Sequence, residues 1–113
     1  MARKNTLTAS PPYAVDHALK RLGDRLRTAR LRRNLTVSQV AERIGTGPRA
    51  VMDVEKGRPG ASAAAYVALL WIYDLAGPLE DLADPALDSA GLARLPPRAR
   101  ARVKATTTLD NDF

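Results

Sequence analysis

The sequence contains no cysteine, and this absence limits both the cellular compartment and the kind of stabilisation that we expect for the protein. Without Cys there is no disulfide framework, so a reducing cytoplasm fits the chain. The chain also lacks a run of 18 apolar residues, and its first residues, MARKNTLTASPPY, contain no apolar stretch typical of a signal peptide. We therefore expect a cytoplasmic protein that is not secreted and has no membrane partner.

Patterns for catalysis and metal binding are missing as well. His17 is the only histidine, so it has neither a second His nor a Cys with which to bind a metal, and no Ser/His/Asp set is indicated. The stretch Gly45-Thr46-Gly47-Pro48 lacks the downstream Gly-Lys-Ser/Thr of a phosphate-binding loop. The sequence therefore predicts no enzyme activity, no cofactor and no metal.

What the chain does carry is charge in blocks, within a formal net charge of +6. Residues 20–33 contain seven basic residues against Asp24 alone, and residues 94–104 contain five basic residues and no acidic one. Residues 74–88 reverse this with five acidic residues and no basic one. Basic blocks suit a polyanion such as DNA, but they are equally typical of a solvated helix face.

A more specific pattern lies in residues 36–57, TVSQVAERIGTGPRAVMDVEKG. Thr36 is a good N-cap for a helix whose apolar residues recur at helical spacing. Gly45 suits the left-handed end of that helix, Pro48 suits the first position of a second helix, and Gly57 closes it. Two short helices around a tight turn form the helix-turn-helix arrangement, although the spacing alone also fits an arbitrary helical hairpin.

Two further helices are expected around this motif. One runs from about Tyr13 to Arg33, with a buried stripe at steps of three and four: Val15, Leu19, Leu22, Leu26 and Ala29. The other runs from about Ala63 to Leu75, is capped by Ser62 and is ended by Gly77-Pro78. A short helix over 79–83 follows.

The helix over 63–75 is apolar on nearly all sides, which predicts burial on two of them. A chain of 113 residues cannot easily supply both surfaces. We therefore expect a homodimer in which Val67, Trp71 and Ile72 lie at the interface.

Several residues across 23–76 stand at the spacing of one DNA-binding family: Leu26, Arg30, Leu35, Ala41, Ile44, Gly45, Val51, Glu55 and Gly57. On these residues the segment resembles the Xre, or lambda-repressor-like, domain. The resemblance implies an all-α fold, a lambda-repressor-like five-helix bundle with a helix-turn-helix, over residues 13–85. Residues 1–12 are then expected to be a disordered arm, and residues 86–113 a flexible basic tail.

The flanking segments LGDRLRTARLRR, LLWIYDLAGPLEDLADP and LDNDF are similar to those of HipB-type regulators. This narrower resemblance implies a sequence-specific repressor that binds double-stranded DNA at an inverted repeat and autoregulates its operon. It also implies an antitoxin role toward a HipA-type kinase toxin. The alternative is a protein-interaction module on the same scaffold that binds little DNA.

In this motif the second helix lies in the major groove with its N-terminal residues at the base edges. The expected base-reading residues are therefore Thr46, Arg49, Ala50, Met52 and Asp53. The expected phosphate contacts, from side chains or helix N-terminal amides, are Thr36, Val37, Ser38, Lys56 and Arg58. The chain departs from the family at Val37, often a Gln, and at Pro48, often a polar reader, so sequence discrimination is expected to be modest.

Two further expectations concern pairs of features. The resemblance places Arg30 and Glu55 on facing helices, which predicts a structural ion pair rather than a DNA contact. At the C-terminus, Leu109 and Phe113 are spaced apolar anchors with Asp110 and Asp112 beside them. We interpret this end as the segment that binds the kinase partner, whereas a solubilising tail whose arginines touch DNA is the alternative.

Overall fold

The structure is a computed structural model that describes residues 5–98, and every regular element in that range is a helix. The chain divides into two compact units, residues 1–76 and residues 77–113. No helix among the described residues is both long enough and apolar enough to cross a membrane. Because the two units are separate bodies, each is described by itself.

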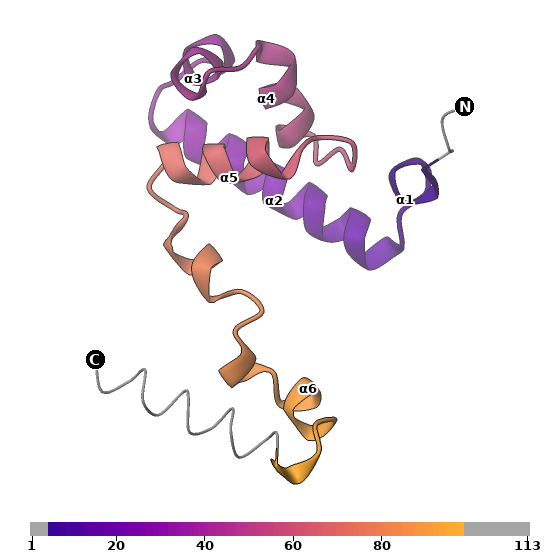
Figure 1. Ribbon diagram of the computed structural model, residues 1–113. Helices are drawn as coiled ribbons and strands as arrows, with labels where there is room; N and C mark the ends of the chain where they lie inside the picture. The colour runs from indigo at the N-terminus through magenta and orange to yellow at the C-terminus, as the bar shows by residue number, and fades with distance from the viewer. Residues whose placement is uncertain (1–4, 99–113) are drawn as a thin grey trace. The chain divides into compact units, whose positions relative to one another are not determined.

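The first unit holds five helices (Figure 1): α1 (Thr6–Ala9), α2 (Tyr13–Arg32), α3 (Val37–Ile44), α4 (Pro48–Glu55) and α5 (Ala63–Ile72). Helix α4 packs against α2, α3 and α5, and α3 also packs against α5. The single turn of α1 lies in the arm that the sequence analysis expected to be disordered, and the Asn5 side chain caps it by accepting from the Thr8 amide.

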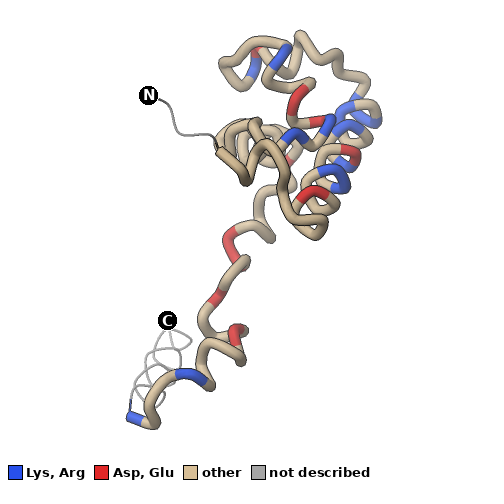
Figure 2. Tube along the Cα trace, turned by 90° about the vertical axis from the view of Figure 1, so that its right-hand side faces the viewer, with Lys and Arg blue, Asp and Glu red and all other residues tan. Residues whose placement is uncertain are grey.

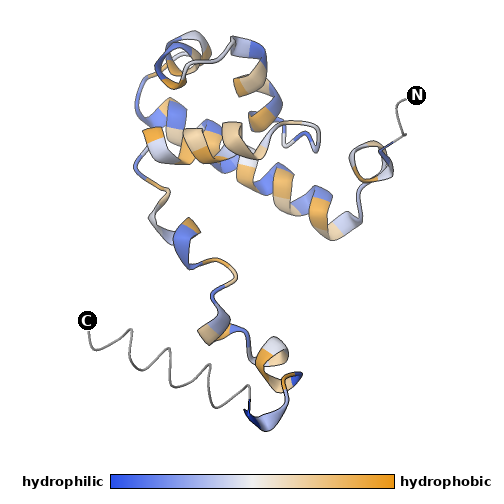
Figure 3. Cartoon of the chain, in the orientation of Figure 1, coloured by the Kyte–Doolittle hydropathy of each residue, from blue (hydrophilic) through white to orange (hydrophobic). Residues whose placement is uncertain are grey.

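The core lies where these helices meet. Its fully buried side chains come from α2, α3, α4, α5 and the residue that follows α5: Leu26, Val40, Val51, Val54, Leu69 and Tyr73. The predicted stripe of α2 is buried or half-buried from Leu19 onward, but Val15 is exposed. Helix α2 has 20 residues and α4 has eight, about 30 Å against 12 Å, so the first turns of α2 extend beyond their packing partners (Figure 3).

Helices α2, α3, α4 and α5 end in a common way, with one residue in the left-handed conformation. Gly45 and Gly57 take this role after α3 and α4, with φ of 80° and 67°, as the sequence predicts. Asn34 and Asp74 do the same after α2 and α5, with φ of 54° and 59°. In each case the next amide donates back into the last turn, which satisfies carbonyls that would otherwise lack a partner.

Helix α5 is therefore shorter than expected. The sequence analysis extended it to Leu75, but it ends at Ile72. The left-handed turn at Asp74 allows the Leu75 amide to donate to the Leu70 carbonyl at 2.7 Å, which closes the helix before Gly77-Pro78 is reached.

Two glycines let α2 and the end of α4 approach closely. A Cβ on Gly23 would lie against the Val54 carbonyl oxygen and 2.8 Å from that of Glu55. A Cβ on Gly57 would lie 2.5 Å from the Lys20 Cα. Gly23, which from the sequence is merely tolerated inside a helix, is thus required by the crossing of α2 and α4.

The second unit begins with two 3₁₀ helices, η1 (Gly77–Asp81) and η2 (Pro85–Leu87), followed by α6 (Ser89–Ala93). The short helix expected over 79–83 is thus a 3₁₀ helix that begins and ends two residues earlier. Part of the expected flexible tail is also helical, because Asp84 and Asp88 cap η2 and α6 by accepting from the Ala86 and Gly91 amides, each at 2.9 Å. These carboxylates act as helix caps, which the charge count did not reveal.

Candidate nucleic-acid interface

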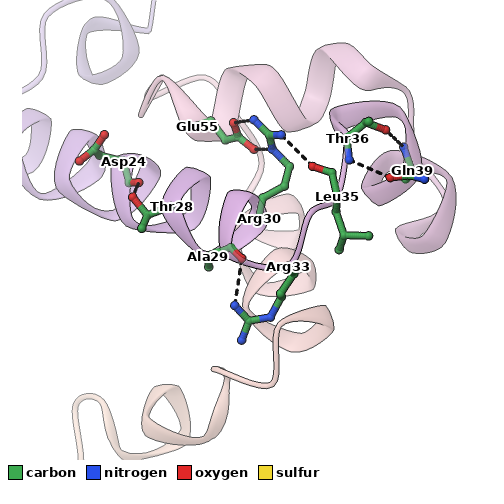
Figure 4. A network of polar contacts seen from close by, with 9 residues as sticks. All are labelled: Asp24, Thr28, Ala29, Arg30, Arg33, Leu35, Thr36, Gln39 and Glu55. Atoms are coloured by element: carbon green, nitrogen blue, oxygen red, sulfur yellow. Dashed lines mark hydrogen bonds and ion pairs between the residues drawn. The ribbon is translucent and has the colours of Figure 1, made fainter.

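Local interactions fix the start of α3. The Thr36 hydroxyl accepts from the Gln39 amide at 3.1 Å, and the Thr36 amide donates to the Gln39 side-chain oxygen at 2.9 Å (Figure 4). This reciprocal capping box satisfies two amides that the first helical turn would otherwise leave open. The sequence predicts Thr36 as the cap but not the part played by Gln39, although Thr-x-x-Gln before an apolar run is the signal for this arrangement.

The turn between α3 and α4 follows the residues expected to make it. Gly45 ends α3 in the left-handed conformation, Gly47 is the N-cap of α4, and Pro48 occupies the first turn, where its missing amide costs nothing. Val51 and Val54 are buried and set the rotation of α4 about its axis. The opposite side of α4 is therefore presented outward.

The predicted base-reading residues lie on or beside this outward side. Thr46, Arg49 and Met52 are exposed, whereas Ala50 and Asp53 are partly buried. Arg49 has no ion-pair partner among residues 5–98, so its guanidinium is available to a ligand. Met52 supplies an apolar contact on the same side.

The predicted phosphate contacts surround these residues. Thr36, Ser38, Lys56 and Arg58 are exposed, and Val37 is half-buried because it packs against the core. The Thr36 oxygen already accepts a hydrogen bond within the cap, and this leaves the hydroxyl hydrogen to donate to an anion.

Behind α4, Arg30 and Glu55 form a two-pronged ion pair (Figure 4). Arg30 Nε and Nη2 donate to the two Glu55 carboxylate oxygens at 2.7 and 3.0 Å, and Nη1 donates to the Leu35 carbonyl at 2.9 Å. The side chains are 11% and 7% exposed, and the hydrogen bond to Glu55 raises the pKa of Arg30. Arg30 thus joins α2 to α4 and to the loop before α3, and it faces away from solvent.

The basic block of residues 20–33 does not act as one surface. Arg30 is inside, and Arg33 donates to the Ala29 and Tyr73 carbonyls, each at 2.9 Å, with its guanidinium over the Tyr73 ring. Arg21, Arg25 and Arg32 are exposed about half a helical turn from Gly23 and Arg30, the residues that face α4. The basic residues of α2 therefore lie on several sides of the helix, and Arg21, Arg25 and Arg32 lie on the side opposite α4. Figure 2 marks the Lys and Arg positions along the chain.

Two of the predicted DNA contacts contact each other. Arg58 Nε lies 3.4 Å from Asp53 Oδ1, with the side chains 52% and 30% exposed. The Arg58 amide also donates to the Asp53 carbonyl at 3.0 Å, and the Tyr66 hydroxyl donates to the Arg58 carbonyl at 3.2 Å. From the sequence, Asp53 is expected at a base and Arg58 at a phosphate, whereas the structure brings the two side chains together.

The residues predicted for a dimer interface lie on α5. Trp71 and Val67, one helical turn apart, are 66% and 41% exposed, and Ile72 is half-buried against the core. The residues predicted to bind a protein partner, Leu109, Asp110, Asp112 and Phe113, lie outside the described residues.

A family model described as a helix-turn-helix domain matches residues 21–83, which includes α3, the turn and α4. No curated protein and no solved structure matches the chain.

Proposed function

The chain belongs to the helix-turn-helix domain family, which indicates a DNA-binding regulator, and we propose that it is a sequence-specific transcriptional repressor. The observation that supports this proposal is the outward side of α4, on a helix fixed by buried valines. Arg49, which has no ion-pair partner in the part of the chain that the structure describes, stands there beside Met52. Helix α4 is of a width that the major groove of B-DNA accepts.

In this proposal, Arg49 donates a fork of two hydrogen bonds to a guanine, the commonest specific contact in the major groove. Ala50 and Met52 contact thymine methyl groups, Thr46 lies at the edge of the same surface, and Asp53 lies one turn after Arg49 on its outward side. Lys56 contacts phosphate with its side chain.

Phosphate contacts on the other side of the groove come from the start of α3. Ser38 is exposed there, and the amides of the first turn at Val37 and Ser38 point toward an anion placed at this end of the helix. Such contacts fix the position of the domain on the duplex and carry no sequence information.

We further propose that the repressor is a two-fold dimer formed through α5. Trp71 and Val67 present an exposed apolar stripe, and large aromatic residues commonly provide the buried centre of an interface. Two-fold symmetry places two copies of α4 about 34–36 Å apart, over an inverted repeat.

The antitoxin role is part of the same proposal and is supported by the resemblance of the flanking segments to HipB-type regulators. Here the C-terminal residues 109–113 bind a HipA-type kinase toxin in the cytoplasm, with Leu109 and Phe113 as anchors. Deleting residues 109–113 keeps the basic block of residues 94–104. Partner affinity should fall and operator affinity should stay, whereas the reverse result would assign this end to DNA.

One specific observation favours a second function: α4 carries few side chains that can read bases. Pro48 occupies its first position, and the Asp53 carboxylate would lie among phosphates. In this alternative the domain is a protein-interaction module that binds little DNA.

Selection of duplexes from a random pool, followed by gel shifts at two salt concentrations, separates the two functions. If the protein is a repressor, the selection should yield an inverted repeat. The logarithm of its binding constant should fall with the logarithm of the salt concentration, with a slope of about 0.9 for each phosphate contact. Failure to enrich any sequence, together with weak binding at low salt, would support the interaction module.

The dimer is tested through Trp71, the only tryptophan of the chain. Its fluorescence should shift to shorter wavelength as protein concentration rises and the indole leaves water, in step with the mass measured by sedimentation. Trp71→Ala should give a monomer. A parent mass that stays monomeric across the micromolar range would refute the interface.

A further inference from the structure

The Asp53–Arg58 pair is an unusual feature of a surface proposed to bind DNA. Residues 49, 53 and 56 lie at helical spacing on the outward side of α4, so the Asp53 carboxylate stands between two cationic side chains, Arg49 and Lys56. An acidic residue at this place repels phosphates unless its charge is compensated. Arg58 supplies that compensation in the free protein.

Arg58 is positioned for this contact by its backbone. Its amide donates to the Asp53 carbonyl and its carbonyl accepts from the Tyr66 hydroxyl, so both backbone polar groups of the residue are held. Its side chain borders a hollow of about 360 Å³ that is also lined by Asp53, Thr8 and the loop residues 59–61. The hollow therefore leaves the half-exposed Arg58 side chain space in which to move.

The ion pair itself is open. The distance of 3.4 Å is longer than a charge-assisted hydrogen bond, and half of the Arg58 side chain is exposed. Pairs of this kind contribute little to stability in water. A DNA phosphate shares one negative charge between two oxygens and can accept a fork of two hydrogen bonds from Arg58. It can therefore replace the Asp53 carboxylate as the partner of Arg58.

We infer that Asp53 and Arg58 form an internal counter-ion pair that DNA must break, with Arg58 moving to a phosphate and Asp53 left facing the groove. This inference deepens the proposed function and rests on it. In the complex, the Asp53 carboxylate accepts a hydrogen bond where a base offers an amino group, such as N4 of cytosine, and repels where none is offered. Asp53 thus adds sequence specificity by repelling sites that offer it no amino group. This repulsion compensates for the small number of base-reading side chains on α4.

The test uses the full chain and the Asp53→Asn variant, which keeps the side-chain shape and removes the charge. Affinity for a random duplex should rise about 3- to 10-fold, because neither the pair nor the repulsion has to be overcome. Affinity for the selected operator should rise less. The matched control is Asp24→Asn on α2, which makes the same change in net charge at an exposed residue and should leave affinity near that of the parent.

The role of Arg58 is tested by repeating Asp53→Asn in an Arg58→Ala background. If DNA breaks the pair, the gain from Asp53→Asn is larger when Arg58 is present. If Arg58 merely shields Asp53 and never reaches a phosphate, the gain is larger when Arg58 is absent, and the inference is overturned. If the parent protein binds DNA and Asp53→Asn does not raise its affinity, the inference is also overturned. If the parent protein binds no DNA, the proposed function is refuted instead.

Discussion

Replacing Arg30 with alanine should destabilise the first unit far more than the loss of an exposed arginine. The change removes three hydrogen bonds at once, two to the Glu55 carboxylate and one to the Leu35 carbonyl. It also leaves the Glu55 side chain, which is 7% exposed, as a charge without its counter-ion. Water cannot replace the guanidinium at such a site without opening the contact between α2 and α4.

The expected magnitude follows from this burial. Removing one partner of a buried ion pair costs about 3–5 kcal/mol, and small domains have about 5–15 kcal/mol of stability in total. For a unit of this size, 1 kcal/mol corresponds to about 4–8 °C in melting temperature. Arg30→Ala should therefore lower the melting temperature by at least about 12 °C. Because the hydrogen bond to Glu55 raises the pKa of Arg30, the guanidinium stays charged as pH rises from neutral to alkaline, and the loss should not shrink in that direction.

The assay is thermal and urea unfolding followed by circular dichroism at 222 nm. Arg32→Ala is the matched control, since Arg32 is exposed on the same helix and has no ion-pair partner among residues 5–98; it should change stability by less than about 0.5 kcal/mol. The double variant Arg30→Met/Glu55→Met should recover most of the loss, because it removes the isolated charge. If the free energy of unfolding of Arg30→Ala lies within about 1 kcal/mol of that of the parent in the same assay, the reasoning is refuted, because a buried pair is expected to cost more.

Gly23→Ala should cost about 2 kcal/mol although alanine favours helix, because the new methyl group meets α4 backbone; Gly60→Ala, which meets nothing within 4 Å, is its control in thermal unfolding. Tyr73→Phe should match or exceed the parent in stability at pH 7, since the buried Tyr73 hydroxyl has no hydrogen-bond partner among the described residues. Burial raises the pKa of Tyr73 above its ordinary value of 10.0, because the fold favours the neutral phenol. The stability that this preference gives the parent is full below about pH 10 and is lost as pH rises through the folded-state pKa. In urea unfolding at high pH, the parent should therefore lose more stability than Tyr73→Phe. Arg49→Ala should lose about 1–3 kcal/mol of discrimination at one base pair in gel shifts, whereas Lys56→Ala should weaken operator and random DNA alike and flatten the salt slope by about one unit.

The sequence could predict α3, the turn and α4 because their signals are local. A cap, a left-handed glycine and a proline in the first turn each act within a few residues, and each stands where the structure uses it. Helix ends made by other residue types were harder to predict. Asn34 and Asp74 also take the left-handed conformation, but Asn and Asp occur in many contexts, so neither was recognised as an end of α2 or α5.

Features that depend on contacts between distant segments could not be predicted from local patterns. Gly23 is an ordinary helix interruption until the α4 carbonyls are placed against it. A count of charges treats every arginine as available to DNA. It therefore could not predict that Arg33 and Arg58 have partners within the protein. The Arg30–Glu55 pairing was predicted through the family resemblance, because only the resemblance placed these residues on facing helices.

Helix α5 shows what an apolar pattern without a period can and cannot specify. Its composition predicts burial, but an all-apolar helix gives no information about which side faces the core. The structure supplies the rotation by burying Tyr66, Leu69 and the following Tyr73, and this leaves Trp71 and Val67 outward. The core of one chain thus needs only one side of α5. The second apolar side has no role in the fold of a single first unit, and exposing a tryptophan and a valine one turn apart brings that unit no stability. Since a helix that served the core alone would carry polar residues there, the outward stripe is better explained by a requirement outside the first unit, which is the argument for the proposed dimer.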